Sequence, residues 1–266
     1  RPTTTIGLHN AKIRRNVIYT NLDNRRPVIL AIFGYDAGYE GDENYWGGHA
    51  VVGDGYGMVN YADDSTGEIT NSVEYVHLNM GWGGQYDAWY NIPDVEVVDV
   101  DPDGTEFGNR YTVMAGAIYN IYTNETGEIV SGRVFDENGN PMEGVTVSVG
   151  NRSARSDSAG IYSLVLPSND TYELNAISSD SRYVGSTTIT VGKSYSSSDS
   201  GNEVTEVGNR WGVDINLELS VYADSVRRVK TGELYCSLID AQNAIEPNET
   251  IEIIKPTLID KSFSFE

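Results

Sequence analysis

The sequence has a single cysteine, no apolar run long enough to span a bilayer, and few basic residues. With Cys236 as its one cysteine among 266 residues, the chain cannot close an internal disulfide. The lack of a long apolar run excludes a transmembrane helix and hence membrane insertion. The chain holds 18 basic and 39 acidic residues, a formal net charge of -21. Because such a field repels phosphate backbones and anionic lipid headgroups, the sequence predicts no nucleic-acid partner and fits a soluble secreted protein.

The composition is that of a folded protein. Hydrophobic residues make up 39% of the chain, which is enough to bury a core, and the length suits roughly two domains. The sequence opens Arg1-Pro2-Thr3, with neither an initiator Met nor a signal peptide, and it closes on the alternating run Ser262 to Phe265. We therefore expect it to be an internal piece of a longer protein.

The first part of the sequence, residues 1–123, is predicted as an α+β half-domain with an antiparallel sheet. The stretch from Ile6 to about Asp23 has the pattern of one amphipathic helix, although Thr20-Asn21 favours an earlier end. One helix followed by several strands is typical of an α+β fold. Apolar runs indicate these strands, at 27–33, 49–54, 75–80, 88–92 and 111–119.

Behind residue 123 the pattern changes to short strands separated by Asn, Gly, Asp and Ser turns. Val145, Val147 and Val149 alternate with polar residues. This period of two is typical of strands with one buried face. The sequence therefore predicts an all-β sandwich at 124–221.

The most informative residues are a histidine and an asparagine on two short apolar runs. His49 lies in Gly47-Gly48-His49-Ala50-Val51-Val52, and Asn79 lies in Val76-His77-Leu78-Asn79-Met80. A thiolate nucleophile needs an imidazole that lowers its pKa and later protonates the leaving amine. An amide side chain can orient that imidazole without titrating. If the two strands lie side by side, His49 is the base and Asn79 its orienting partner.

Glycines and a tryptophan surround these two residues. Gly47 and Gly48 remove side chains just before His49, which leaves room for a substrate backbone to approach. Further glycines flank Trp82, whose indole can shield the hydrogen bond between His49 and Asn79 from water.

These motifs together resemble the streptopain-like (C10) cysteine peptidases of the papain superfamily. The resemblance covers Ile6 to about Tyr122 and is carried by Gly-Gly-His-Ala-Val-Val, His-Leu-Asn-Met-Gly-Trp-Gly-Gly and Tyr-Asp-Ala-Trp-Tyr-Asn-Ile. It implies the second half of a papain-like catalytic domain. In that half His49 is the catalytic base, Asn79 its orienting residue and Trp82 the shielding indole.

The nucleophile is missing from this pattern. In papain-like chains it precedes the histidine by ~130–150 residues. Counted back from His49, the expected position of the nucleophile therefore lies before Arg1, outside this sequence. The resemblance also implies an oxyanion-hole glutamine upstream of that cysteine. Cys236 follows the histidine and lies in another module, which reverses the order of the family. His77 is the rival base, but no glycine pair opens space around it and we interpret it as structural.

An acidic segment suggests a metal ion. Asp99, Asp101 and Asp103 alternate before Gly104, as in the first half of a calcium loop. The twelfth position of such a loop is Arg110 rather than a glutamate, and no flanking helices are predicted. The open alternatives are a weak extracellular Ca2+ site and an acidic turn exposed to solvent. Catalysis by a cysteine, histidine and asparagine requires no cofactor.

The middle of the chain resembles a carboxypeptidase regulatory-like domain. Its motifs are Gly132-Arg133-Val134-Phe135-Asp136, Gly139-Asn140-Pro141 and the segment from Ser156 to Tyr162. The resemblance implies a small prealbumin-like β-sandwich of the kind appended to secreted and cell-surface proteins. No catalytic residues gather there, so we expect a role in spacing or docking.

The tail, residues 222–266, is predicted as a short α/β segment. A helix from Leu238 to Ile245 and a strand from Glu249 to Ile254 resemble the cap that covers the first coil of a right-handed β-helix. That resemblance implies a parent protein that continues as a solenoid.

The leading hypothesis is a fragment of a secreted or cell-surface cysteine endopeptidase that acts on proteins or peptides. The fragment carries the base and the orienting residue without the nucleophile, so it is expected to be inactive alone. Its first partner is the missing N-terminal half of the catalytic domain. The alternative is a non-catalytic adhesion or surface-display protein whose peptidase fold has decayed. A third hypothesis, polysaccharide binding or cleavage by a solenoid, depends on sequence beyond Glu266.

Overall fold

The computed structural model describes residues 3–6, 8, 11–36, 46–92, 95–100, 102, 106–122, 125–194 and 207–256. Contacts divide the chain into two compact units that do not follow chain order. The first unit combines residues 1–131 with 164–170 and 190–211, and the second combines 132–163, 171–189 and 212–266.

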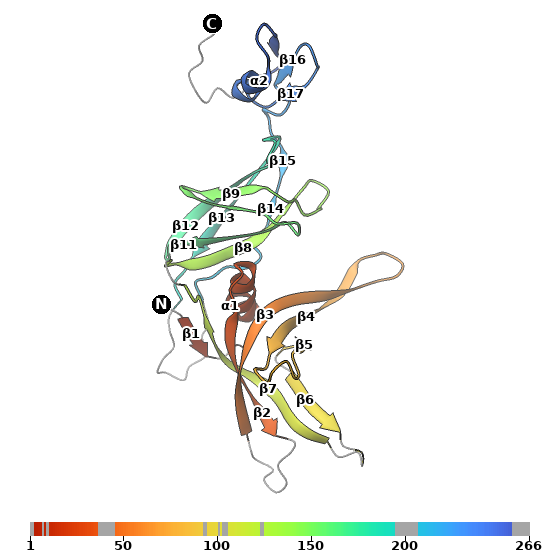
Figure 1. Ribbon diagram of the computed structural model, residues 1–266, viewed down its shortest axis with the longest axis vertical. Helices are drawn as coiled ribbons and strands as arrows, with labels where there is room; N and C mark the ends of the chain where they lie inside the picture. Colours follow the sequence, from red (N-terminus) through yellow and green to blue (C-terminus); the bar gives the residue numbers. More distant parts are fainter. Residues whose placement is uncertain are drawn as a thin grey trace. The chain divides into compact units, whose positions relative to one another are not determined.

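A seven-stranded antiparallel sheet forms the first unit (Figure 1). Its strands follow the order β1-β7-β2-β3-β4-β5, and β6 pairs with β7 beside this path. They are β1 (Thr3–Ile6), β2 (Val28–Asp36), β3 (Trp46–Ala62), β4 (Ile69–Asn79), β5 (Ala88–Tyr90), β6 (Val95–Val100) and β7 (Glu106–Tyr119).

One helix, α1 (Ala11–Asp23), packs on this sheet. Its buried residues Ile13, Val17 and Ile18 share a core with strand residues such as Leu30, as expected of an amphipathic helix. The predicted start at Ile6 was wrong. Ile6 belongs to β1, where it pairs with Gly116.

The sheet has a buried face and a more exposed face. Leu30, Val51 and Leu78 are fully buried and define what we call the inner face. Their neighbours Ile29 and Val52 are partly exposed, because successive side chains of a strand point to opposite sides. We call this second side the outer face.

A buried polar network ties residues 207–211 into the first unit. Asn209 is 0% exposed, and its amide nitrogen donates to Asn120 Oδ1 over 2.9 Å and to Thr20 Oγ1 over 3.1 Å. Its Oδ1 accepts from the backbone nitrogen of Ile129 at 2.9 Å. Since buried polar groups without partners are costly, this network holds segments that are far apart in sequence.

The strands of the predicted sandwich lie wholly or in part in the second unit. A five-stranded sheet runs β10-β9-β12-β13-β15 and a three-stranded sheet runs β11-β8-β14. The α+β character of the first part and the β-sandwich behind it are thereby confirmed. The strands are β8 (Glu128–Phe135), β9 (Thr146–Val149), β10 (Arg152–Arg155), β11 (Ile161–Leu166), β12 (Asp170–Ile177), β13 (Tyr183–Val191), β14 (Ile215–Asn216) and β15 (Glu218–Leu219).

The tail forms a small three-stranded sheet with one short helix. Strands β17 (Leu234–Tyr235), β16 (Val226–Arg228) and β18 (Ile251–Ile253) pair in that order, and α2 (Leu238–Ala244) lies between β17 and β18 in the chain. Ser237 caps α2, because its side chain accepts from the backbone nitrogen of Asp240.

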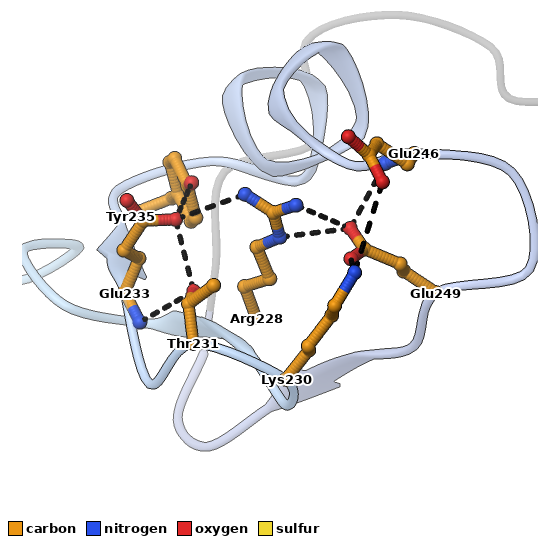
Figure 2. Close-up of polar contacts among 7 residues, drawn as sticks. All are labelled: Arg228, Lys230, Thr231, Glu233, Tyr235, Glu246 and Glu249. Carbon is orange, nitrogen blue, oxygen red and sulfur yellow. Dashed lines mark hydrogen bonds and ion pairs between the residues drawn. The ribbon is translucent and has the colours of Figure 1, made fainter.

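Several ion pairs join side chains within the tail (Figure 2). Glu249 lies 2.6 Å from Arg228 Nη2 and 2.7 Å from Lys230 Nζ. Arg228 also reaches Glu233 at 3.1 Å. Among the described residues of the tail, the buried apolar cluster has Val226, Leu238 and Ala241 at its centre, so these pairs supplement a small core.

Candidate active site

His49 lies on β3 beside the point where β4 ends. The pairing of β3 with β4 closes at Val52 opposite Asn79, whereas β3 continues along β2, with His49 opposite Ile32. The chain that leaves β4 at Met80 therefore passes next to His49. His49 shares the inner face with Val51, two residues along the strand.

The imidazole of His49 is anchored to the backbone. Its Nε2 lies 2.8 Å from the carbonyl oxygen of Met80. Because a carbonyl oxygen only accepts hydrogen bonds, Nε2 must be the donor. In the neutral ring Nδ1 is then the unprotonated nitrogen, which is the atom that can take up a proton.

Two aromatic rings enclose this imidazole. Trp82 stacks on it with ring centroids 4.7 Å apart and an angle of 19° between the planes. Tyr111, which is 4% exposed, has its ring centroid 6.3 Å away. Trp82 itself remains 38% exposed, and its indole covers one face of the imidazole.

A tight turn between β4 and β5 holds the Met80 peptide. Gly81, Gly83 and Gly84 have φ of 76°, 69° and 92°, values that glycine adopts without strain. Asp87 closes the turn, because its Oδ1 accepts from the backbone nitrogen of Met80 at 2.7 Å. The peptide groups on both sides of Met80 are thus engaged, one by Asp87 and one by His49.

The predicted contact between His49 and Asn79 is not made. Asn79 pairs with Val52 and so lies on the outer face, on the opposite side of the sheet from His49. Its Oδ1 accepts from the backbone nitrogen of Gly81 at 2.9 Å. The Met80 carbonyl takes the position at Nε2 that the sequence suggested for the amide, and Asn79 holds the start of the turn instead.

The two glycines before His49 differ in their surroundings. A Cβ on Gly48 would lie 2.5 Å from Cε1 of Phe33, so Gly48 gives room to the Phe33 ring on the outer face. Gly47 pairs with Gly34 and shares the inner face with His49. Of the two predicted substrate-binding glycines, only Gly47 is therefore on the side of the imidazole.

His77 belongs to a different environment on the outer face. Its Nδ1 lies 2.6 Å from Asp54 Oδ1, and Trp89 meets its ring edge-on at 5.3 Å between centroids. Trp89 also covers Gly55, where a Cβ would lie 3.2 Å from the indole. His77 and His49 therefore point to opposite faces.

Cys236 has the environment of a structural residue. It is 6% exposed, and its Sγ lies 3.6 Å from the carbonyl oxygen of Asp180. Burial raises the pKa of the Cys236 thiol, whereas a nucleophilic cysteine needs a lowered pKa. This environment does not favour Cys236 as the nucleophile.

The predicted calcium ligands fall mainly outside the described residues. Asp99 is in β6, opposite Phe107, while Asp101 and Asp103 are not described. Within the described ranges no three His, Cys, Asp or Glu residues are grouped so that they could hold a metal ion. Neither described helix is long and apolar enough to cross a membrane.

The geometry around His49 lies within a segment similar to a known family. Residues 3–90 match the Peptidase C10 family. Residues 129–205 match the carboxypeptidase regulatory-like domain, in the order that the sequence motifs predicted. No curated protein matches the chain significantly. The chain thus carries a segment related to cysteine peptidases of the C10 family, followed by a β-sandwich module.

The surroundings of His49 also contain functional candidates that the sequence motifs did not single out. Met80 contributes a carbonyl, which no side-chain pattern reveals. Asp87 stands in the quoted motif Tyr-Asp-Ala-Trp-Tyr, yet only the turn shows that it bonds Met80. Tyr111 is distant in sequence and reaches His49 through the pairing of β7 with β2.

Proposed function

We infer that this chain provides the base half of a cysteine-peptidase active site. His49 is the base, and the thiol comes from polypeptide that is not among these 266 residues. The observation that carries the proposal is the bond from His49 Nε2 to the Met80 carbonyl. It leaves Nδ1 to accept a proton, on a ring that Trp82 covers.

The arrangement supports the proton transfers of peptide hydrolysis. Nδ1 takes the proton of an incoming thiol, and the resulting thiolate attacks the peptide carbonyl. The imidazolium returns this proton to the leaving amine as the C–N bond breaks and a thioester forms, and Nδ1 then takes a proton from the water that hydrolyses the thioester and returns it to the thiol. The Met80 oxygen accepts from Nε2 throughout, so it stabilises the charged ring and keeps it in place as an amide side chain would.

The remainder of the chain fits an enzyme that works outside the cell. The net charge of -21 and the carboxypeptidase regulatory-like match at 129–205 support a secreted or cell-surface protein in which the module spaces or docks the catalytic part. Protein or peptide substrates follow from the proposed chemistry. Calcium at Asp99, Asp101 and Asp103 remains a prediction from the sequence.

The alternative is a surface or adhesion protein with an inactive peptidase fold. It is favoured by one observation, that the single cysteine of the chain is a buried residue with a raised pKa. The two functions differ in whether a cysteine thiol lies within hydrogen-bonding distance of His49 in the complete protein.

Hydrolysis of a fluorogenic peptide separates the two. The chain alone should be inactive, because its only thiol is Cys236. Joined to the polypeptide encoded upstream, it should hydrolyse the peptide, and His49→Ala should lower the rate by about 10³-fold while the fold persists. His77→Ala, on the outer face, should retain the rate. An active His49→Ala variant would exclude the base assignment, and inactivity of the joined protein would favour the surface protein.

A further inference from the structure

The Met80 peptide connects a carboxylate to the imidazole of His49. Asp87 Oδ1 accepts from Met80 N at 2.7 Å, and Met80 O accepts from His49 Nε2 at 2.8 Å. A hydrogen-bonded chain thus runs from an acidic side chain through two backbone groups of one residue to the proposed base. We propose that Asp87 is a positioning residue for His49, acting through the Met80 backbone.

The physical reason lies in the turn itself. Met80 is followed by glycines at 81, 83 and 84 in left-handed conformations, so the backbone here has more freedom than in a strand. A carbonyl that rotates by a few tens of degrees loses its bond to Nε2, since hydrogen bonds weaken steeply with angle. The charged acceptor Asp87 fixes the Met80 nitrogen, and with it the peptide group that precedes the Met80 Cα about which the carbonyl rotates.

A second effect is electrostatic. The carboxylate of Asp87 lies 2.7 Å from Met80 N, so its negative charge acts through space on the neighbouring Met80 carbonyl. The charge of Asp87 also reaches beyond Met80, because it is one cause of the raised pKa of Tyr90, after burial of that hydroxyl. The Tyr90 hydroxyl in turn donates to the carbonyl of Tyr86 at 2.7 Å, which fixes the residue before Asp87.

Asn79 offers a matched comparison within the same turn. Its Oδ1 accepts from Gly81 N at 2.9 Å, and Gly81 N belongs to the same planar peptide group as the Met80 carbonyl. Asn79 and Asp87 therefore hold the two peptide groups on either side of the Met80 Cα. Only Asp87 is charged, so its replacement by asparagine separates the effect of the charge from that of the hydrogen bond.

The test measures the protonation and hydrogen bonding of the His49 imidazole by nuclear magnetic resonance of the full chain. Nitrogen-15 chemical shifts report which ring nitrogen of His49 carries the proton, and solvent exchange of the Nε2 proton reports how firmly it is bonded. Asp87→Ala should speed this exchange about tenfold and mix the two tautomers. Asp87→Asn keeps an acceptor without the charge, so the Nε2–H tautomer should persist with an intermediate exchange rate.

Two further variants accompany these. Asn79→Ala releases the peptide group that carries the Met80 carbonyl, so it should also speed exchange of the His49 Nε2 proton. Asp54→Ala should alter His77, which it contacts at 2.6 Å, and not His49. Should Asp87→Ala fail to fold, Asp87→Asn decides: exchange as slow as in the unmodified chain would overturn the proposal. A His49 exchange rate in Asp87→Ala no faster than that in Asp54→Ala would also overturn it.

The inference rests on the proposed role of His49 as base, but its outcome can be told apart from that role. The spectra require no thiol and no substrate. A joined protein that fails to hydrolyse peptides would refute the peptidase, while the dependence of the His49 ring on Asp87 would still be measured.

Discussion

The Nε2 of His49 lies 2.8 Å from the carbonyl oxygen of Met80 and not against the side chain of Asn79. A backbone carbonyl cannot be removed by substitution, so the orientation of this imidazole depends on whatever holds the Met80 peptide. This relationship changes what mutations around His49 should do.

Asn79→Ala should have a small effect on the base. The variant loses the bond to Gly81 N, which should destabilise the turn by about 1 kcal/mol and loosen, without removing, the Met80 carbonyl that His49 bonds. In a joined protein with a thiol, we expect a much smaller loss of rate than for His49→Ala. A loss as large as that of His49→Ala would mean that the amide contacts the imidazole during turnover.

Trp82→Ala should expose the His49 ring. The two rings stack at 4.7 Å, and such a contact contributes about 1 kcal/mol beyond the area that it buries. Urea denaturation should show this loss, and the His49 resonances should shift. Trp89→Ala is the matched control, because Trp89 contacts His77 and should shift only the His77 resonances. Unchanged His49 resonances in Trp82→Ala would contradict the stacked arrangement.

Apolar runs predicted much of the fold but not the contact of the base. They located β2, β3, β4 and β7, because the buried face of each strand is apolar. A shift of one residue moves a side chain to the other face, and this is how Asn79 came to be assigned to the side of His49. Asn79 pairs with Val52, which lies three residues from His49 on the same strand, so the side chains of Val52 and His49 point to opposite faces.

Other features were beyond the reach of motif analysis for different reasons. Met80 acts through its backbone, which is the same in every residue. Strand β6 was missed because the acidic pattern around Asp99 suggested a metal loop, although Asp99 pairs with Phe107. The contacts of Asn209 join positions far apart in the chain, and nothing in a single sequence marks such a pairing.

Asn209→Ala should unfold the first unit more easily. The substitution leaves the Ile129 nitrogen without its acceptor and removes the donor to Asn120 and Thr20. Because these groups are buried, we expect a loss of about 3 kcal/mol in the free energy of unfolding. The urea midpoint measures this change. Asn175→Ala, at an exposed position, should shift the midpoint little, and equal shifts for the two variants would contradict the network.

The tail should lose stability in acid. The pKa of Glu249 is lowered from 4.5 to about 2, first by its contact with Lys230 and also by the Glu246 nitrogen and Arg228 (Figure 2). Because the folded tail binds the proton more weakly than the unfolded chain, the stabilisation is present above pH 4.5 and is lost as the pH falls toward 2.

Nuclear magnetic resonance of the tail between pH 5 and pH 2 would show this transition, expected on the order of one to two pH units above the folded pKa. Glu249→Gln should make the tail less stable at neutral pH and remove this part of the pH dependence. Glu252→Gln is the control, since Glu252 and its partner Arg227 are each 47% exposed. A tail whose stability is equal at both ends of the range would contradict the role of Glu249.

The acceptor of the His49 Nε2 proton can be identified by scalar coupling across the hydrogen bond in the isotope-labelled chain. The structure predicts a cross-peak from His49 Nε2–H to the backbone carbonyl carbon of Met80. A cross-peak to the side-chain carbonyl of Asn79, or a ring that carries its proton on Nδ1, would contradict the account of His49 as a base held by the Met80 backbone.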